Sequence, residues 1–309
     1  MPTTPKTLIE AVRYFSDLDA CNAYMVDIRW PDGKITCPKC GCDRVGKIET
    51  RKMLKCKNPE CRKQSSYKVG TIFEDSPIGL DKWFVAVWCI TNAKNGISSY
   101  ELAKAIGVTQ KSAWHMLHRI RLAMQTGSFS KLSGTIEADE TFVGGRAKNM
   151  HKASRKNKIK GRGAVGKAIV QGVMERGGAV IAGVVSDAKR RTLQPNVRNA
   201  VEPGAAVYTD ALKPYEGLED AYLHETVDHA REYVRGDVHT NSMENFWSLL
   251  KRCIHGTYIA VQPWQLFRYV DEQVFRFNER HKTDGERFAE VMSRAVGRRL
   301  TYSALTDNA

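Results

Sequence analysis

Three acidic residues stand at positions from which a folded chain could direct carboxylates at one point. Asp139 lies late in the β-rich run TIEADETFV, and Asp210 ends the run AAVYTD. Glu244 lies in the first turns of the helical segment NSMENFWSLLKRCI, and Lys251 follows two turns later on the same face. Carboxylates bind hard cations, and two ions about 3.5–4 Å apart can clamp the attacking and leaving oxygens of a phosphodiester. We therefore expect the three acids to be catalytic residues that hold two Mg²⁺ or Mn²⁺ ions. Lys251 should contact the substrate backbone beside them.

Each acid taken alone also has an ordinary explanation. Asp210 could cap the segment that follows it, and Glu244 could be a solvated helix acid. Glu137 shares a strand face with Asp139, two residues earlier, and Glu140 is adjacent. The residue pattern alone therefore leaves open which acid of this run is the first metal ligand.

Four cysteines form two pairs at the spacing of a zinc ribbon. Cys37 and Cys40 are separated by two residues, and Cys56 and Cys61 by four, with fifteen residues between the pairs. Four thiolates suit one tetrahedral zinc and leave no open position for catalysis, so we expect one structural zinc ion. Cys42 is interpreted as a spare thiol. The alternative is a group of reduced structural cysteines without metal.

A pair of amphipathic helices is expected at residues 97–121. Ser98 or Ser99 can cap the first helix, Gly107 can end it, and Thr109 can cap the second. A short turn between two such helices is typical of a helix-turn-helix that places its second helix in the major groove. The residues expected to contact DNA share the polar face of that second helix: Lys111, His115, His118 and Arg119. The alternative is a plain helical hairpin that packs on another domain.

The chain is strongly basic, with a formal net charge of +14, which favours an anionic partner. Residues 146–163 carry eight Lys or Arg and no acid, and they follow the strand that carries Asp139. We expect this loop to neutralise phosphates of double-stranded DNA, the alternative being a disordered, solvated insertion. The DNA-binding residues expected there are Arg146, Lys148, Lys152, Arg155, Lys156, Lys158, Lys160 and Arg162.

Hydrophobic patterning predicts an α/β protein with more than one domain. Helical spacing predicts one helix at 7–28 and three helices at 80–126. From about residue 134 there are five short β-rich runs: TIEADETFV, AIVQGVMERG, AVIAGVVSD, AAVYTDA and AYLHETV. Helical segments at about 190–201 and from 241 onward add to these runs, which indicates a mixed sheet with flanking helices. No run approaches the roughly 18–20 apolar residues needed to span a bilayer, and the first residues do not resemble a secretory signal, so we expect a cytoplasmic protein. The expected organisation is an N-terminal helix at 1–29, a zinc ribbon at 30–75, a helix-turn-helix region at 78–128, a catalytic domain at 132–283 and a C-terminal tail at 284–309.

Several stretches together resemble the zinc-ribbon DDE insertion-sequence transposases of the IS-fifteen-ninety-five (ISXO-like) family. The resemblance runs through about residues 8–283, and the DETFVGG and HTNSMENFWSLLK motifs are the most specific. The matching stretches are RWPDGKITCPKCG at 29–41, GTIFEDSPIGLDKWFVAVW at 70–88, the ELAKAIGVTQKSAWHMLHRIR helix pair, IEADETFVGGR at 136–146, VYTDALKPYEGL at 207–218, VHTNSMENFWSLLKRCIHGTY at 238–258 and FRYVDEQVFRFNER at 267–280.

The resemblance implies an RNase H-like catalytic domain whose metal-binding triad falls on Asp139, Asp210 and Glu244. Lys251 falls on the companion lysine of this family. Asn241 is a competing or supporting residue for the third position of the triad, and His239 belongs to the same motif as an accessory residue without an assigned role. The implied activity is binding of terminal inverted repeats followed by strand cleavage and transfer. A homodimer or higher oligomer on DNA, in the bacterial nucleoid, is expected. Two alternatives are a nuclease or resolvase of the same fold and a domesticated zinc-ribbon/helix-turn-helix regulator.

Overall fold

The computed structural model describes residues 5–125, 130–144, 166–210, 213–227, 239–259 and 261–306. The chain divides into two compact units: unit 1 comprises residues 1–125 and 281–309, and unit 2 comprises residues 126–280. The basic loop expected at 146–163 lies outside the described residues, so its eight basic side chains have no structural description. Within the described ranges, none of the helices has the length and apolar character needed to cross a membrane.

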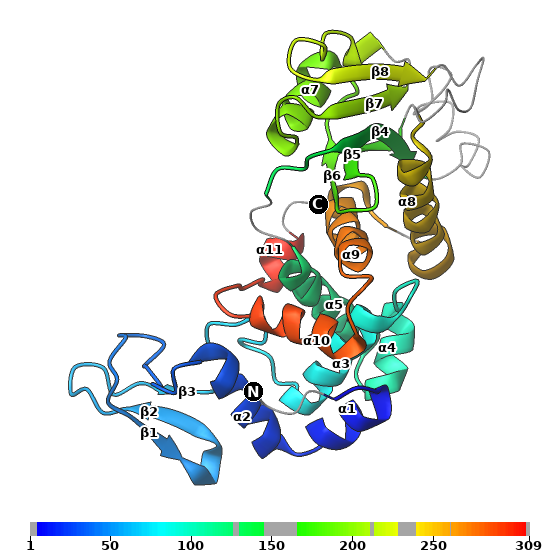
Figure 1. Ribbon diagram of the computed structural model, residues 1–309. Helices are drawn as coiled ribbons and strands as arrows, with labels where there is room; N and C mark the ends of the chain where they lie inside the picture. Colours follow the sequence, from blue (N-terminus) through cyan, green and yellow to red (C-terminus); the bar gives the residue numbers. More distant parts are fainter. Residues whose placement is uncertain are drawn as a thin grey trace. The chain divides into compact units, whose positions relative to one another are not determined.

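Unit 1 begins with two short helices and a small antiparallel sheet (Figure 1). Residues 7–28, expected as one helix, form two, because the Asp17 carboxylate accepts the backbone N–H of Asp19 and starts a new helix. The sheet has the order β1-β2-β3, and a left-handed residue, Lys52, turns the chain between its first two strands. The elements are α1 (Leu8–Phe15), α2 (Leu18–Arg29), β1 (Val45–Ile48), β2 (Met53–Cys56) and β3 (Gln64–Ser65).

The three helices expected between residues 80 and 126 are present in unit 1. The Ser98 side chain caps the second of them in a capping box, Gly107 ends it with φ +63°, and Thr109 caps the third. These caps match the sequence-based expectation, because the Ser and Thr hydroxyls accept free N–H groups at a helix start and glycine readily adopts the positive φ that ends a helix. The helices are α3 (Leu80–Asn92), α4 (Ser99–Ile106) and α5 (Gln110–Met124).

The C-terminal residues do not form a tail, contrary to the expectation for 284–309. They add α10 (Asp284–Ser293) and α11 (Tyr302–Thr306) to unit 1, and α10 packs against α3 and α5. Phe288 of α10 is fully buried and its ring centroid lies 5.3 Å from that of Phe15 and 5.5 Å from that of Trp88. Both ends of the chain therefore complete one aromatic core.

Unit 2 is built on a mixed sheet whose five strands match the five β-rich runs of the sequence. The strand order is β6-β5-β4-β7-β8, with β4, β5 and β6 antiparallel and with β7 and β8 parallel to β4. Strand β4 is central, so residues on it can contact both halves of the sheet. The strands are β4 (Thr135–Val143), β5 (Ala168–Glu175), β6 (Val180–Val185), β7 (Ala206–Asp210) and β8 (Leu223–Val227).

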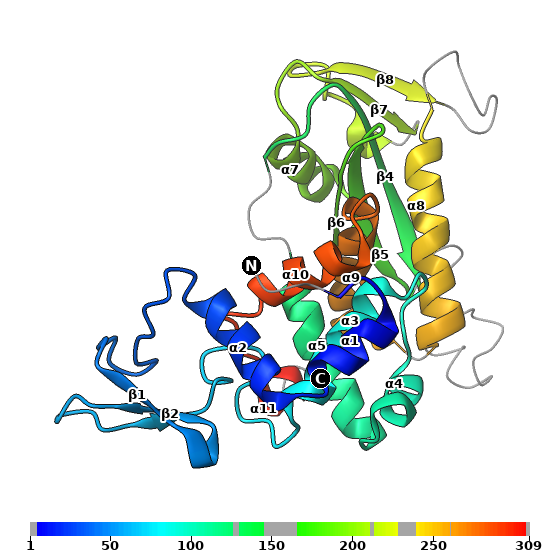
Figure 2. The ribbon, with the colours of Figure 1, turned by 60° about the horizontal axis from the view of Figure 1, so that its bottom comes forward.

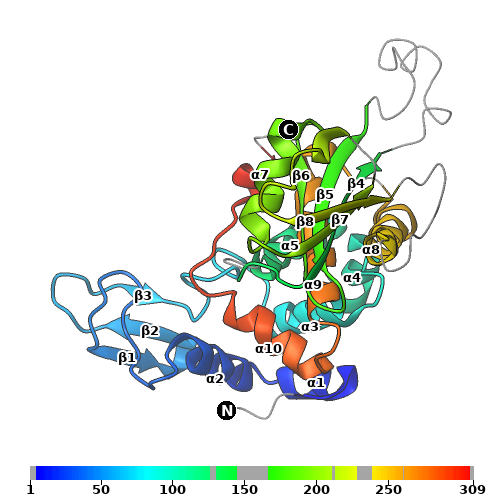
Figure 3. The ribbon, with the colours of Figure 1, turned by 45° about the horizontal axis from the view of Figure 1, so that its top comes forward.

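Helices cover both faces of this sheet (Figures 2 and 3). One face packs Ile136 and Ala138 against α7 (Arg190–Ala200) and the 3₁₀ turn η3 (Lys213–Tyr215). The other face packs against α8 (Asn241–Arg252), its π-helical end η4 (Cys253–Tyr258), the turn η5 (Pro263–Gln265) and α9 (Leu266–Asn278). Alternate strand residues point to opposite faces, so Glu137 and Asp139 face α8.

Candidate functional site

Asp139 and Asp210 lie on neighbouring parallel strands of unit 2. The register pairs Ala138 of β4 with Thr209 of β7, and each of these residues is followed directly by one of the two aspartates. Because both aspartates stand one residue beyond a matched pair, they fall on the same face of the sheet, toward α8. The expectation that they lie on neighbouring strands is confirmed.

Helix α8 presents Glu244 beside this pair. The helix buries Met243, Phe246, Trp247 and Leu250 against the sheet, which leaves Glu244 exposed. The Trp247 indole Nε1–H donates to the Asp139 Oδ2 at 2.9 Å. This hydrogen bond links the helix to the first aspartate one turn after Glu244, and it holds the Asp139 carboxylate in one orientation.

The Asp139 carboxyl lies in an environment that disfavours its charge. Burial raises the pKa of Asp139 to about 6, with further contributions from the charges of Asp210 and Glu244, against the Trp247 hydrogen bond that lowers it. Carboxylates held together in this way repel one another until a cation or a proton neutralises them. The donor set therefore fits a divalent cation.

Glu140, the neighbour of Asp139, points to the opposite face of the sheet. Its carboxylate accepts the Tyr215 hydroxyl at 2.9 Å. Burial, and then the charges of Asp210 and Asp139, raise the pKa of Glu140 to about 7, although the Tyr215 hydrogen bond lowers it. Glu140 thus adds negative potential from the α7 side.

The three acids are more widely spaced than the thiols of the cysteine cluster described below. Apart from those thiols, the described part of the chain has no three Asp, Glu, His or Cys ligand atoms all within 4.8 Å of one another. The assignment of Asp139, Asp210 and Glu244 as ligands of two metal ions therefore stays a prediction. A pair of ions separated by about 3.5–4 Å explains a wider spread, because the outer ligands then bind different ions. On α8, Asn241 is exposed and Lys251 is half-buried.

Glu137, an alternative first ligand in the sequence, is fully buried and bonded to protein donors. Its Oε1 accepts from the Arg176 Nε at 2.9 Å and from the Ser242 hydroxyl at 3.0 Å, and its Oε2 accepts the Met243 backbone N–H at 3.0 Å. The His239 Nδ1 lies 3.5 Å from Oε1. These contacts disfavour Glu137 as a metal ligand. The sequence did not reveal these contacts, although Glu137 and Asp139 were recognised as sharing a strand face.

Gly172 allows α8 to approach the sheet. It pairs with Asp139 across β4 and β5, and a Cβ placed on it would lie 2.4 Å from the Met243 Cε and 2.8 Å from the Trp247 ring. A larger residue would force the Met243 methyl and the Trp247 ring to shift. The glycine therefore allows these two α8 side chains to pack directly on the sheet beside Asp139.

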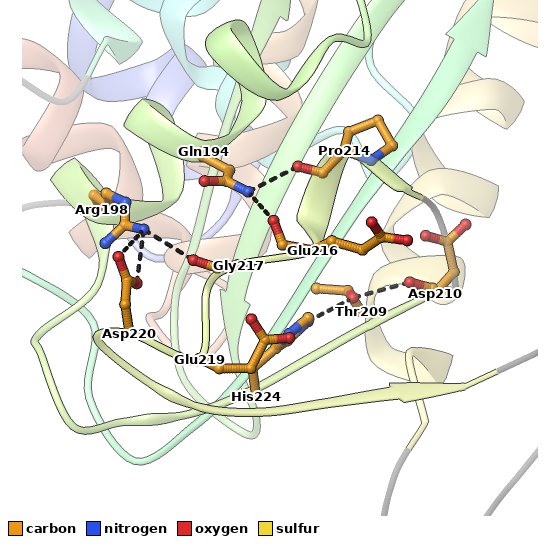
Figure 4. A network of polar contacts seen from close by, with 10 residues as sticks. All are labelled: Gln194, Arg198, Thr209, Asp210, Pro214, Glu216, Gly217, Glu219, Asp220 and His224. Atoms are coloured by element: carbon orange, nitrogen blue, oxygen red, sulfur yellow. Dashed lines mark hydrogen bonds and ion pairs between the residues drawn. The ribbon is translucent and has the colours of Figure 1, made fainter.

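A polar network supports the end of β7 below Asp210 (Figure 4). The Thr209 hydroxyl donates to the Asp210 carbonyl at 2.9 Å and lies 3.0 Å from the His224 Nε2. The His224 Nδ1 lies 3.0 Å from the Glu219 carboxylate, and this hydrogen bond lowers the pKa of Glu219. Strand β8 is thereby tied to the strand that carries Asp210.

Helix α7 holds the segment after β7 through the other contacts in Figure 4. Gln194 donates to the carbonyls of Pro214 and Glu216 at 3.0 and 2.8 Å. Arg198 forms a bidentate pair with Asp220, at 2.8 and 3.0 Å. These contacts fix the turn that also carries Tyr215, the partner of Glu140.

The four cysteines expected to bind zinc converge in unit 1. The Sγ atoms of Cys37, Cys40, Cys56 and Cys61 all lie within 4.8 Å of one another. The first pair lies in a knuckle where the Gly41 N–H donates to the Cys37 carbonyl and φ of Gly41 is +72°. Cys42 is not part of the cluster, as expected. Four sulfur donors in this arrangement fit one structural zinc ion.

The polar face of α5 is less accessible than the sequence suggested. Lys111 is exposed and His115 half-buried, but His118 and Arg119 are buried. Arg119 donates to the Glu74 carbonyl and lies over the Trp83 ring, 5.2 Å from its centroid, and burial lowers its pKa to about 10. Placing His118 and Arg119 on a DNA-facing surface was therefore wrong. The long arginine stem packs like an apolar residue, which the charge pattern hides.

Family comparisons place this chain among transposases. Residues 131–278 match the ISXO2-like transposase domain, and residues 16–64 match the transposase zinc-ribbon domain. The chain therefore belongs to the IS1595-type family of transposases. The first match covers the sheet with all three acids, and the second covers the four-cysteine cluster.

Two curated relatives agree with this assignment. An uncharacterized protein in transposable element ISH50 of Halobacterium salinarum is 31% identical over 255 residues, which cover 77% of this chain and 83% of that protein. An uncharacterized transposase-like protein of Haemophilus influenzae is 28% identical over 96 residues, 31% of this chain and 77% of that protein. No solved structure matches the chain.

Proposed function

We propose that this protein binds the terminal inverted repeats of an insertion sequence and catalyses metal-dependent cleavage and joining of DNA strands. The observation that carries the proposal is that Asp139 and Asp210 lie on neighbouring strands facing the helix of Glu244, where burial, then the charge of Asp210 and last that of Glu244 raise the pKa of Asp139. The strand order β6-β5-β4-β7-β8, antiparallel in its first three strands and parallel in its last two, supports an RNase H-like catalytic fold.

In this proposal the three acids hold divalent cations, either Mg²⁺ or Mn²⁺. When bound, such ions lower the pKa of an attacking water or hydroxyl and stabilise the leaving 3′-oxygen. The Asp139 carboxylate stays oriented through Trp247, and the network that ends at Glu219 holds the backbone at Asp210. Lys251, further along the Glu244 face of α8, contacts a DNA phosphate.

DNA binding is assigned to unit 1 and to the basic loop. The helix pair α4–α5 offers Lys111 and His115 for duplex DNA, and the loop at 146–163 adds eight cations next to the strand of Asp139. A net charge of +14 supports a polyanionic partner. Because two element ends must be held together for joining, we also propose a homodimer or higher oligomer on DNA, acting at the nucleoid in the cytoplasm of a bacterium.

The test uses the full-length protein and duplexes that carry the ends of its own element. With Mn²⁺ or Mg²⁺, the wild type should cleave these ends and join them to a second duplex. Asp210→Asn and Glu244→Gln should remove both products, while binding to the same duplexes, measured by fluorescence anisotropy, changes less than about threefold because it rests on other groups. Glu225→Gln, an exposed acid on the edge strand β8, is the control and should retain activity.

Three results would contradict the proposal. Full strand joining by Glu244→Gln would move the third ligand elsewhere on α8. Cleavage without any joining by the wild type would indicate a nuclease or resolvase. Specific DNA binding without cleavage would indicate a regulator.

A further inference from the structure

The N-terminus of α8 is held by a carboxylate from a different element, Glu137 of β4. A helix begins with backbone N–H groups that have no partner within the helix, and a side chain at the N-cap position often binds them. The N-cap residue here, Thr240, makes no such side-chain bond. The Met243 N–H donates instead to the Glu137 Oε2, across 106 positions of sequence.

Arg176 and His239 lie against this carboxylate. We call Glu137, Arg176 and His239 together the α8 latch. The Arg176 Nε donates to Glu137 at 2.9 Å, and its Nη2 donates to the His239 carbonyl at 3.0 Å and to the His239 Nδ1 at 3.1 Å. Because a guanidinium only donates, the His239 Nδ1 carries a lone pair, and the proton of the neutral ring lies on Nε2. The Arg176 guanidinium also lies 5.2 Å from the centroid of the Tyr208 ring on β7.

The latch connects the three elements that carry the acids. Glu137 is two residues before Asp139 on β4, Tyr208 is two residues before Asp210 on β7, and the capped turn of α8 is followed at once by Glu244. A carboxylate is also favourable at a helix N-terminus, because the partial positive charge of that end attracts it. With no exposed surface, Glu137 makes these bonds free from competition with water.

We propose that Glu137, with Arg176 and His239, is a positioning group that sets the distance of Glu244 from Asp139 and Asp210. This inference rests on the proposed function, because it assigns the latch to the metal-binding geometry of the acids. Glu137 itself binds no metal ion, since its two oxygens already accept three protein donors. His239, which the sequence left without a role, serves the same purpose by receiving Arg176.

The test compares Glu137→Gln with the wild type in Mn²⁺ titrations. A glutamine replaces one acceptor oxygen with an NH₂ group that faces other donors, so the latch loosens while volume is kept. Groups behind metal ligands typically change metal affinity by about 10–100-fold. We therefore expect the Mn²⁺ concentration for half-maximal strand joining to rise about tenfold, with activity recovered at saturating Mn²⁺. Arg176→Lys, which keeps the charge but cannot reach all the partners of the guanidinium, should have the same effect.

A matched control and a double variant separate positioning from general destabilisation. Glu175→Gln, next to Arg176 but on the opposite sheet face, should leave the half-maximal Mn²⁺ concentration unchanged. Adding Glu137→Gln to Glu244→Gln should weaken Mn²⁺ binding, measured by calorimetry, less than twofold further, because the ligand that the latch positions is already lost.

The inference is overturned if Glu137→Gln and Arg176→Lys lower the melting temperature or the active fraction without changing the Mn²⁺ requirement. It is also overturned if the two losses of Mn²⁺ affinity are additive in the double variant. In both cases an inactive Glu244→Gln would leave the proposed function standing, whereas an active Glu244→Gln would remove the function and the latch together.

Discussion

Neutralising Asp139 should stabilise unit 2 when no divalent cation is bound. Folding raises the pKa of this carboxyl from 3.8 to about 6, so its ionised form is less favourable in the folded than in the unfolded protein. At roughly 1.36 kcal/mol per pKa unit, a shift of about two units gives an upper limit near 3 kcal/mol. Coupling to Asp210 and Glu244 divides this cost among several groups. We therefore expect Asp139→Asn to gain about 1–3 kcal/mol, or roughly 3–9 °C in Tm, at pH 8.

The sign of this effect depends on pH. Because the folded pKa is raised, the penalty is absent below the unfolded pKa, grows as the pH rises and is complete above the folded value of about 6. The gain of Asp139→Asn should therefore be full at pH 8 and small at pH 4.5. Adding Mn²⁺ at pH 8 should stabilise the wild type more than the variant, because the ion binds the folded state through this carboxylate.

Thermal unfolding of protein dialysed against buffer without Mg²⁺ or Mn²⁺ measures these differences. A strong chelator must be avoided because it would also remove zinc from the cysteine cluster. Asp187→Asn is a control of opposite sign: the Thr192 hydroxyl and the Lys189 N–H lower the pKa of Asp187, so its loss should destabilise at pH 8. If Asp139→Asn lowers Tm equally at pH 4.5 and pH 8, Asp139 is not under repulsion, and the electrostatic reasoning fails.

Three further predictions concern zinc, packing and protons. Cys56→Ser should reduce the zinc content from about one ion per chain to nearly none by elemental analysis, whereas Cys42→Ser should leave it unchanged. Gly172→Ala should destabilise unit 2 by about 1–3 kcal/mol in denaturant unfolding, because the new Cβ would overlap side chains of α8. Gly183→Ala on β6 is the control and should be nearly neutral, because no atom lies within 4 Å of the new Cβ. The affinity for Mn²⁺ should fall as the pH drops through about 6, because protons then compete for Asp139. If the Mn²⁺ affinity stays the same between pH 5 and pH 8, the raised pKa of Asp139 is contradicted.

The strands and caps of this protein follow from local sequence, but the contacts of the site do not. Runs of β-branched residues identified all five strands of unit 2, and Ser98, Gly107 and Thr109 marked the ends of the helix pair. The adjacency of Asp139 and Asp210 depends on strand register, which local patterns do not determine. The positions of the two acids near strand ends suggested the pair, Glu137 and Glu140 stayed open as alternatives to Asp139, and the family resemblance selected Asp139.

Residues with distant partners were the least predictable. Glu137 was recognised only as a competitor of Asp139, because its partners Arg176 and Met243 lie 39 and 106 positions away. The charge of Arg119 suggested a solvent-facing residue, but its long aliphatic side chain allows it to be buried. The spacing of Phe288, Val291 and Met292 was a usable signal for α10, since three apolar residues at intervals of three and one fit a helix face.

The shared core of the chain ends has a consequence for the order in which the protein is made. A ribosome releases residues 126–280 before it releases α10, so unit 2 can fold while unit 1 still lacks Phe288 and the apolar face around it. The full packing of α5 therefore requires residues that are synthesised after the whole of unit 2. A chain that stops after residue 280 would carry all three acids in unit 2, but its unit 1 would lack α10.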